Sequence, residues 1–401
     1  MYTNFAILSI FALCYSLVAG RLEKTAITGP MIFLVFGFIS SPLMFGWLSF
    51  DLDRGVLRTL ADITLALVLF IDAANSDKSV LKRHSAIPTR MLLIGLPLTI
   101  FLGVIAGVFL FESWGIWECA ILATMLTATD AALGKGVVTN KAVPIRLREG
   151  LNVESGLNDG ICVPLLLAFI VMAEAQGSSE LGTVELIVHH MLQEIGIGLI
   201  VGVVVTTIAA YMMNFAMQRG WMTKIWLQLP VVMVAIACFS LAQMLHGSGY
   251  IAAFVGGLLF GSLAKEKTHS LVMDAEGLAE TLAMFTWIVF AATFIGQMTG
   301  LLTWNAFIYA ILSLTVVRIL PMFLSLSGTG EKVESKLFLA WFGPRGFASI
   351  VFAIIVLTSE VEHAQEMAVV VMLTVILSAF LHGITASPFA NALAKRLTSK
   401  S

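Results

Sequence analysis

Charged residues are scarce in this chain. Asp, Glu, Lys and Arg make up 12% of the 401 residues, whereas 59% are hydrophobic; a soluble domain carries about 25% charged residues. Long polar stretches are lacking too, because the polar loops hold at most roughly a dozen residues, too few for a separate soluble domain. The composition therefore excludes a soluble globular protein. It indicates an all-α polytopic protein of the lipid bilayer, with one membrane domain over residues 1–401.

Motifs of several other protein classes are missing. No basic block suggests a nucleic-acid partner. Neither HExxH nor GxSxG occurs, which argues against a membrane-embedded hydrolase, so we expect no enzyme and no cofactor. No CxxC pair occurs, and the four cysteines stand alone in apolar segments, where we expect buried structural thiols: Cys14, Cys119, Cys162 and Cys238. The seven histidines cluster near segment ends, as His189, His190, His246 and His363 do, and we expect them at the surface.

Apolar segments of membrane-spanning length fill the chain. A span needs about 17–25 residues, and thirteen segments qualify. The first, unlike a cleaved signal peptide, has its basic residues after it (Arg21, Lys24), which predicts a retained helix with its N-terminus outside. The predicted spans are 4–20, 26–48, 56–75, 87–111, 115–138, 148–175, 189–217, 224–245, 247–264, 277–298, 303–325, 334–358 and 366–390.

The basic residues test this number of spans. With the N-terminus outside, only Arg54 and Arg58 fall in outer loops, and Arg318 and Arg345 fall within spans. A missed span would invert all later loops, so the asymmetry supports thirteen spans with the C-terminus in the cytoplasm. The nineteen basic residues assigned to the inside are Arg21, Lys24, Lys78, Lys82, Arg83, Arg90, Lys135, Lys141, Arg146, Arg148, Arg219, Lys224, Lys265, Lys267, Lys332, Lys336, Lys395, Arg396 and Lys400.

The odd number of spans suits two six-helix repeats of opposite orientation. We expect a first repeat over 1–175, a linker helix over 189–217 and an inverted repeat over 224–390. The second and ninth spans open on similar sequences, and the fifth and twelfth both carry polar interruptions, at 127–130 and 343–346. Interrupted spans at matching positions of two halves indicate a transport site near the middle of the bilayer.

The sixth span carries costly polar groups. Asp159 follows Arg148 by eleven residues, or roughly 16 Å along a helix, which is near the midplane. An acid there costs about 2.5–3.5 kcal/mol on insertion scales, so a binding or transport role is expected. Ser155 shares a helical face with Asp159, while Glu154 and Asn158 share the neighbouring face. Their oxygens suit a hard cation such as Na⁺. Because burial disfavours a charged carboxylate, one acid can hold either a proton or a cation.

The two interruptions supply further candidates. Asp130 suits the start of a new half-helix, where its charge meets the positive ends of helix dipoles, and backbone carbonyls near Thr129 can bind a cation; a capping role alone is the alternative. Pro344 suits the first position of the resumed twelfth helix. Arg345 must pair with a carboxylate or with helix carbonyls, and we expect a structural role for it at the crossing.

Arg318 is the other intramembrane cation. We expect it to pair with Glu154, which leaves Asp159 as the acid that can titrate. Asp62 and Asp72 of the third span are the alternative partners, although both can equally face the aqueous ends.

These motifs together resemble one family. Thr129-Asp130 and the run from Arg146 to Gly160, with Glu154-Ser155 and Asn158-Asp159, resemble the monovalent cation/proton antiporters of the NhaP and animal Na⁺/H⁺-exchanger group (CPA1), whose hallmark is T-D followed by E-S-x-x-N-D. The element 343–346 is similar to their G-L-R-G, with proline in place of leucine, and Arg318 matches their eleventh-helix arginine. The resemblance covers the whole chain.

The resemblance implies a fold and a mechanism. It implies an NhaA-like fold with crossed discontinuous helices 5 and 12, a homodimer and an elevator-like movement. The ion site is then built around Asp130, Glu154, Ser155 and Asp159, and the pair Asn158-Asp159 indicates electroneutral exchange of one cation for one proton. We further expect a multi-pass protein of a plasma membrane, namely a prokaryotic inner membrane. As a departure from the family, the sequence ends soon after its thirteenth predicted span, so we expect it to lack the long regulatory tail of some relatives.

The leading hypothesis is therefore a Na⁺ (or Li⁺)/H⁺ antiporter for pH homeostasis. Asp159 exchanges H⁺ for the cation; Na⁺ lies at Asp159, Asp130 and Ser155, with the backbone near Thr129 and with Glu154 as a further candidate ligand. Asn158, Arg318 and Arg345 hold the site electrostatically. A K⁺/H⁺ antiporter with the same site is the nearest alternative, because selectivity depends on cavity size and coordination number. A transport-inactive sensor is a third.

Overall fold

Helices make up all of the regular secondary structure in the described part of the chain. The computed structural model describes residues 2–22, 25, 27–48, 54–75, 86–138, 140, 142–175, 181–223, 226–227, 229–264 and 268–398. The α-helices are α1 (Tyr2–Leu22), α2 (Gly29–Ser40), α3 (Arg54–Asn75), α5 (Ala86–Arg90), α6 (Leu96–Leu110), α7 (Ile116–Met125), α8 (Ala131–Val138), α9 (Ile145–Glu174), α10 (Leu181–Gln218), α11 (Leu229–Met244), α12 (Gly249–Ala264), α13 (Thr268–Met298), α14 (Trp304–Leu314), α15 (Val316–Ser325), α16 (Val333–Trp341), α17 (Phe347–Leu357) and α18 (Ala364–Thr398). A π-helical turn, η1 (Met91–Gly95), joins α5 to α6, and a 3₁₀ turn, η4 (Thr299–Leu301), follows α13.

Many of these helices suit a bilayer. Seven stretches of the described helices are long and apolar enough to cross a membrane, by length and composition: Tyr2–Leu22, Ala86–Leu110, Ile145–Glu174, Leu192–Gln218, Leu271–Thr293, Trp304–Ser325 and Ala364–Leu397. Five shorter apolar helices accompany them: Gly29–Ser40, Ile116–Met125, Leu229–Met244, Gly249–Leu263 and Phe347–Leu357. Each of the thirteen predicted segments contains helix, while thirteen membrane crossings remain a prediction.

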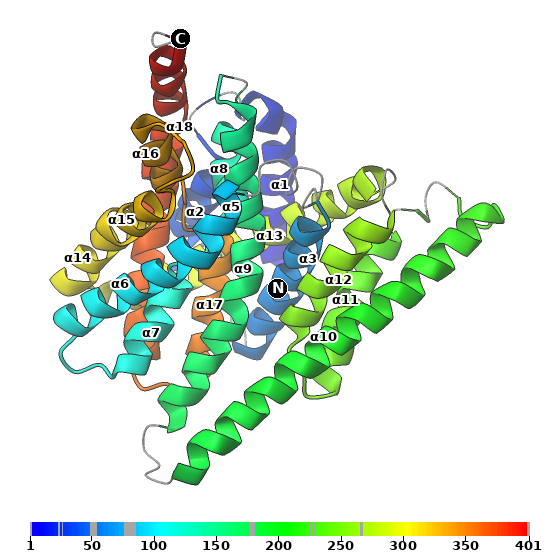
Figure 1. Ribbon diagram of the computed structural model, residues 1–401, viewed down its shortest axis with the longest axis horizontal. Coiled ribbons are helices and arrows are strands. Elements are labelled where there is room, and N and C mark those ends of the chain that lie inside the picture. Colours follow the sequence, from blue (N-terminus) through cyan, green and yellow to red (C-terminus); the bar gives the residue numbers. More distant parts are fainter. Residues whose placement is uncertain are drawn as a thin grey trace.

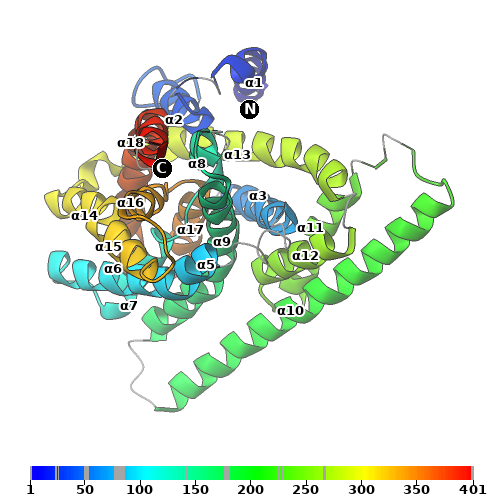
Figure 2. The same ribbon diagram turned by 45° about the horizontal axis from the view of Figure 1, so that its top comes forward.

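The helices form two groups, which Figures 1 and 2 show side by side. In one group α12 packs between α3 and α10, and α13 packs on α2 and α3. In the other, α7 packs on α6 and α9, and α18 packs on α14 and α17. The long helix α10 runs along the outer edge of the first group in both views.

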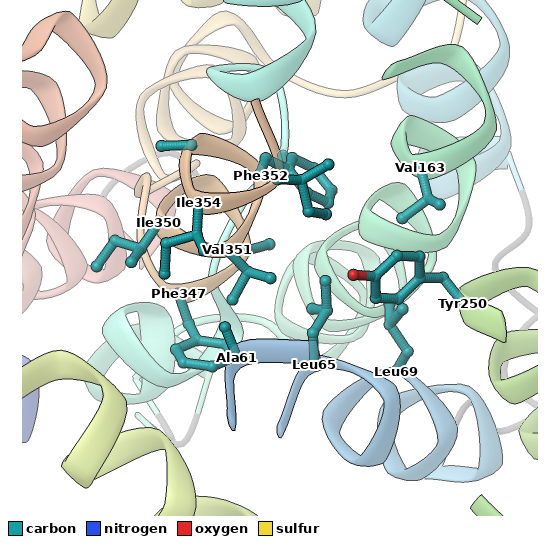
Figure 3. Packing of buried hydrophobic residues seen from close by; sticks show 14 of the residues in the cluster. Ala61, Leu65, Leu69, Val163, Tyr250, Phe347, Ile350, Val351, Phe352 and Ile354 are labelled. Atoms are coloured by element: carbon teal, nitrogen blue, oxygen red, sulfur yellow. The ribbon is translucent and has the colours of Figure 1, made fainter. Parts of the chain in front are cut away.

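The main hydrophobic core joins the two groups through α3. Figure 3 shows Ala61, Leu65 and Leu69 of α3 facing α17, whose Phe347 and Val351 are buried. Val163 of α9 and Tyr250 of α12 close the same core from the other side. Burying these side chains holds α17, and with it α9, which carries site residues, against the first group.

The two predicted interruptions are confirmed. The fifth segment breaks between α7 and α8, and the twelfth between α16 and α17. Two further irregularities were not predicted: the π-helical turn η1 in the fourth segment, and a break at Thr315 between α14 and α15. The second segment also ends its helix early, at Ser40, with a turn after it.

Three expectations need correction. Pro344 does not begin the resumed helix, because α17 starts three residues later at Phe347. Cys14 lies exposed on α1, whereas Cys119, Cys162 and Cys238 are buried as expected. The surface position expected for the histidines is wrong for His382, which is buried within α18. Asp62 accepts a hydrogen bond from the Tyr250 hydroxyl of α12, and an aqueous-end position for Asp62 and Asp72 stays a prediction. Several basic residues used to predict the orientation lie outside the described residues: Lys24, Lys78, Lys82, Arg83, Lys141, Lys224, Lys265, Lys267 and Lys400.

Candidate functional site

The two interrupted segments meet at their breaks. The Asp130 N–H donates to the carbonyl of Pro344 at 2.8 Å, and the Ser349 hydroxyl donates to the carbonyl of Met125 at 2.8 Å. Glycine permits this approach, since a Cβ on Gly346 would overlap the Asp130 carboxylate and one on Gly343 would overlap the Arg318 guanidinium. The backbones of the two segments are therefore in direct contact at the crossing.

Asp130 caps two helices at once. Its Oδ1 accepts the Leu133 N–H at 3.2 Å, at the start of α8, and its Oδ2 accepts the Phe347 N–H at 2.7 Å, at the start of α17. A carboxylate at a helix N-terminus pairs with unsatisfied N–H groups and with the positive end of the dipole. This second cap explains why α17 begins at Phe347 rather than at Pro344.

Arg345 lies at the opposite dipole end. Its Nη1 donates to the carbonyl of Thr127 at 2.7 Å and to that of Ala128 at 3.3 Å, just beyond the C-terminus of α7. The predicted pairing with helix carbonyls is confirmed. Positive charge thus meets carbonyl groups at one face of the crossing, while the negative charge of Asp130 meets N–H groups at the other.

Glu154 and Arg318 form a buried ion pair. Oε1 of Glu154 lies 2.8 Å from Nη1 of Arg318, and their side chains are 2% and 1% exposed. Asn158, on the next turn of α9, donates from Nδ2 to the same Oε1 at 3.3 Å and to the Thr129 hydroxyl. The predicted partner of Arg318 is confirmed. Asn158 ties this pair to the break in the fifth segment, because its Oδ1 also accepts the Thr129 N–H.

Asp159 differs from these groups. It is 6% exposed, and its Oδ1 is buried without a hydrogen-bond partner among the described residues. The acidic groups whose charges act on it are Asp72, Asp130 and Glu154. Ser155, one turn before it, donates its hydroxyl proton to the Thr129 carbonyl at 2.9 Å, which leaves its oxygen lone pairs available. A cation or a proton at Asp159 would relieve repulsion among these acids.

A small cavity reaches the site. Its volume is about 10 Å³, and its polar lining comes from Thr129, Asp130, Asn152, Glu154 and Ser155. Apolar side chains of α8 and the residues Phe342 and Pro344 complete the wall. Its lining runs along α9 from the exposed Asn152 toward the buried Ser155. The cavity therefore approaches the site from the end of α9 that carries Arg148, the predicted cytoplasmic end.

Two residues near the site, Asp72 and His382, were not predicted as site residues from the sequence. The charge of Asp72 acts on Asp159 from α3, across the junction of the two helix groups. His382 is 2% exposed inside α18, although a surface position was expected for the histidines. The signal that could have found His382 is its position in the middle of an apolar span, where a polar side chain needs partners.

The donor atoms of the site are of mixed type. In the part of the chain that the structure describes, no three His, Cys, Asp or Glu side chains are grouped as metal ligands. The oxygens near Asp159 come instead from carboxylate, hydroxyl and backbone carbonyl groups. This mixture suits a weakly held hard cation better than a transition metal.

Comparison with known proteins agrees with this geometry. Residues 7–392 match the family described as "Sodium/hydrogen exchanger, transmembrane". The Na(+)/H(+) antiporter 2 of Zygosaccharomyces rouxii is 24% identical over 90% of this chain and 46% of its own length. The K(+)/H(+) antiporter NhaP of Alkalimonas amylolytica is 24% identical over 96% of this chain and 66% of its own length. The chain thus spans about half to two thirds of these curated relatives.

Solved structures show the same fold. The sodium proton antiporter MjNhaP1 from Methanocaldococcus jannaschii, at pH 8, superposes with a TM-score of 0.77 at 18% identity, over 95% of this chain and 98% of that one. At this identity the likeness concerns the fold alone. It supports an all-α arrangement of the antiporter type for this multi-pass membrane protein.

Proposed function

This chain belongs to the sodium/hydrogen exchanger family, and we propose that it exchanges Na⁺ or Li⁺ for H⁺ across the membrane. In this proposal Asp159 binds the cation and the proton in competition. Ser155, Asp130 and the backbone at Thr129 complete the cation's shell, and Glu154 is a further candidate ligand. The relatives whose names state this activity are longer than the chain, which spans 46% and 66% of their lengths.

One observation carries the proposal: the buried acids at the crossing differ in how they are paired. Glu154 is neutralised by Arg318 at 2.8 Å, and both oxygens of Asp130 accept backbone N–H groups. Asp159, in contrast, keeps a buried oxygen without a hydrogen-bond partner among the described residues. An unsatisfied buried acid is costly unless a proton or a cation joins it, so Asp159 is the acid suited to exchange one for the other.

Asn158 supports electroneutral exchange. Its amide donates to Glu154 and to Thr129, so this position holds the frame and carries no titratable proton. With one exchanging acid, one cation moves for one proton. Transport by the wild-type protein should then be insensitive to an imposed membrane potential, and a strong voltage dependence would contradict this stoichiometry.

The movement and assembly are also proposed. In an elevator-like motion, the helix group of α6, α7, α9, α14, α17 and α18, which contains the crossing, would move past the group of α3, α10, α11, α12 and α13. We propose thirteen membrane crossings, with the N-terminus outside and the C-terminus in the cytoplasm. Two inverted repeats, over 1–175 and 224–390, are joined by a linker helix over 189–217. We also propose a homodimer in a plasma membrane. Relatives come from yeasts as well as from bacteria and archaea, so a prokaryotic inner membrane stays a prediction.

The decisive experiment replaces the exchanging acid. We expect Asp159→Asn in proteoliposomes to abolish Na⁺-driven proton movement, because an amide can neither release a proton nor hold a cation by charge. Glu366→Gln is the control, since this acid is 45% exposed near the start of α18 and should keep full activity. Full activity of Asp159→Asn would overturn the assignment. No flux in the wild type, together with retained cation binding, would favour a sensor instead.

A K⁺/H⁺ antiporter is the second candidate, because one relative carries that name. The same site residues would serve both ions, and selectivity then depends on the number and spacing of the oxygen ligands. A flux assay with Na⁺, Li⁺ and K⁺ compared across pH separates the two candidates. A preference for K⁺ would replace the first by the second.

A further inference from the structure

His382 lies beside the crossing, next to Trp341 and Ser378. It is on α18, one turn after Ser378, and both side chains are buried. The ring lies over Trp341, the last residue of α16, with 5.1 Å between ring centroids. No step of the proposed exchange uses this histidine, yet it contacts both the end of α16 and the residue that holds Arg345.

The Nε2 atom of His382 serves the C-terminus of α16. It lies 3.0 Å from the carbonyl of Trp341. The last carbonyls of a helix have no partner within the helix and need a donor from elsewhere. Arginines act as this donor for two other helices of the group: Arg345 for the carbonyls beyond α7 and Arg148 for Val138 at the end of α8. At the end of α16 the Trp341 carbonyl accepts the Gly343 N–H at 2.9 Å, and the imidazole of His382 is the side-chain donor beside it.

The Nδ1 atom connects the ring to Arg345 through a hydroxyl. The Arg345 N–H donates to Oγ of Ser378 at 2.6 Å, and this Oγ lies 3.1 Å from Nδ1 of His382. Nδ1 also lies 3.0 Å from the Ser378 carbonyl. The hydroxyl of Ser378 thus accepts from one side and has a single proton to give to the other.

Counting protons selects one state of the ring. If Ser378 donates to Nδ1, then Nε2 carries the hydrogen and donates to Trp341, so both ring nitrogens are hydrogen-bonded, with the Ser378 carbonyl as an additional close neighbour of Nδ1. If Nδ1 carried the only hydrogen, the Nε2 lone pair would face the Trp341 carbonyl. An imidazolium could donate to both carbonyls, but it would add a third positive charge where those of Arg345 and Arg318 already act. The neutral ring with hydrogen on Nε2 fits best.

We propose that neutral His382 is a positioning residue for the cation site. Through Ser378 it sets the backbone of Arg345, whose guanidinium holds the carbonyls of Thr127 and Ala128, next to Thr129 of the site. Through Nε2 it holds the end of α16 at the same crossing. This inference rests on the proposed function, because it assigns a role toward the same site. It predicts that cation affinity depends on a residue that does not touch the cation.

Variants at three positions test the relay. His382→Gln keeps a donor near Nε2 and loses the acceptor at Nδ1, His382→Asn does the reverse, and Ser378→Ala removes the hydroxyl alone. Thr374→Val is the matched control, because Thr374 is buried on the same helix and its hydroxyl donates to the Val370 carbonyl of that helix, at 2.7 Å. In proteoliposomes we expect the first three to raise the apparent KM for Na⁺ on the order of tenfold, as for loss of a buried hydrogen bond, with the maximal rate less affected.

The pH profile and a double variant complete the test. Because Na⁺ and H⁺ compete for Asp159, pH profiles are compared at a Na⁺ concentration scaled to the KM of each protein. Under this condition the variants should keep the pH profile of the wild type, because the relay requires a neutral ring, whereas a histidine that titrated during transport would shift it. Ser378→Ala and His382→Gln should be non-additive in thermal unfolding in detergent, since they break the same chain of bonds. Additive unfolding, a pH profile shifted at the scaled Na⁺ concentration, or an unchanged KM would each overturn the inference. A wild type without transport would overturn the proposed function, while the unfolding result would still test the relay.

Discussion

Glu154 and Arg318 hold each other in the interior of the protein, with 2.8 Å between Oε1 and Nη1 and almost no exposure of either side chain. Because they come from α9 and α15, the pair links the helix that carries Asp159 to the half of the eleventh segment that follows its break at Thr315. Two charges removed from water in this way depend on each other. Asp159 lies close to Glu154 in the sequence but differs from it, because Glu154 is neutralised by an arginine whereas Asp159 keeps a buried oxygen without a hydrogen-bond partner among the described residues.

Breaking this pair should destabilise the protein strongly. Glu154→Gln leaves the Arg318 charge buried without its partner, which costs about 3–5 kcal/mol in unfolding free energy. Chemical unfolding in detergent measures the change. The double variant Glu154→Gln/Arg318→Met should recover part of the loss. Arg219→Gln, at an exposed arginine near the end of α10, should change stability by at most about 0.5 kcal/mol. Equal stability of Glu154→Gln and wild type would contradict the pairing.

The crossing should not tolerate a methyl group at Gly346. A Cβ there overlaps the Asp130 carboxylate, which must then leave the N-termini of α8 and α17. We expect Gly346→Ala to lower the melting temperature and to abolish exchange. Gly277→Ala, on α13, meets no atom within 4 Å; it should stabilise its helix by up to about 1 kcal/mol. A well-folded, active Gly346→Ala protein would show that the two breaks do not meet as described.

Asp130→Asn separates capping from charge. The amide keeps one acceptor oxygen but presents an N–H₂ group to a second N–H donor, so one of the two caps is lost at about 1–2 kcal/mol. We expect both lower stability and a higher apparent KM for Na⁺. Thr303→Ala, which removes the N-cap of α14 at the Ala306 N–H, should lower stability by about 1 kcal/mol without changing KM. If the two variants behave alike in transport, Asp130 only caps.

Asn158→Asp should destabilise the site rather than only change its charge count. The new carboxylate would replace an amide that lies 3.3 Å from Oε1 of Glu154, and like charges at that distance repel. The expected result is a clear fall in melting temperature in detergent. Asn152→Asp adds the same charge on the exposed side of α9 and should leave the melting temperature unchanged. Equal melting temperatures for the two variants would argue against the network of Asn158, Glu154 and Arg318.

Local chemistry made much of the site predictable from sequence. Thr129-Asp130 and the Gly343–Gly346 element indicate helix breaks from the local sequence alone, because helix capping and the conformational freedom of glycine affect only neighbouring residues. The partner of Arg318 was predictable as well, since a buried charge needs an opposite one and few acids are available at that depth. The helix breaks and the Glu154–Arg318 pair in the structure agree with these predictions.

The remaining features depend on how distant segments cross. The second cap of Asp130 joins residues 217 apart in the chain, and it moves the start of α17 past Pro344. His382 contacts the end of α16 directly and is connected to Arg345, which precedes α17, through Ser378 of its own helix. The break at Thr315 carries neither glycine nor proline to announce it. Periodicity and composition describe each segment alone. They cannot predict which residues of two distant segments come into contact, because this depends on the angle at which the helices cross.

The narrow cavity beside α9 has a consequence for the ion that enters it. Its volume of about 10 Å³ corresponds to about one water molecule. A cation that reaches Ser155 and Asp130 from this side has therefore shed most of its hydration shell before it is bound. The energy of dehydration differs among Li⁺, Na⁺ and K⁺, and the few oxygens of the site must replace the lost water. Discrimination between these ions would then begin in the approach to the site, ahead of any movement of the helices.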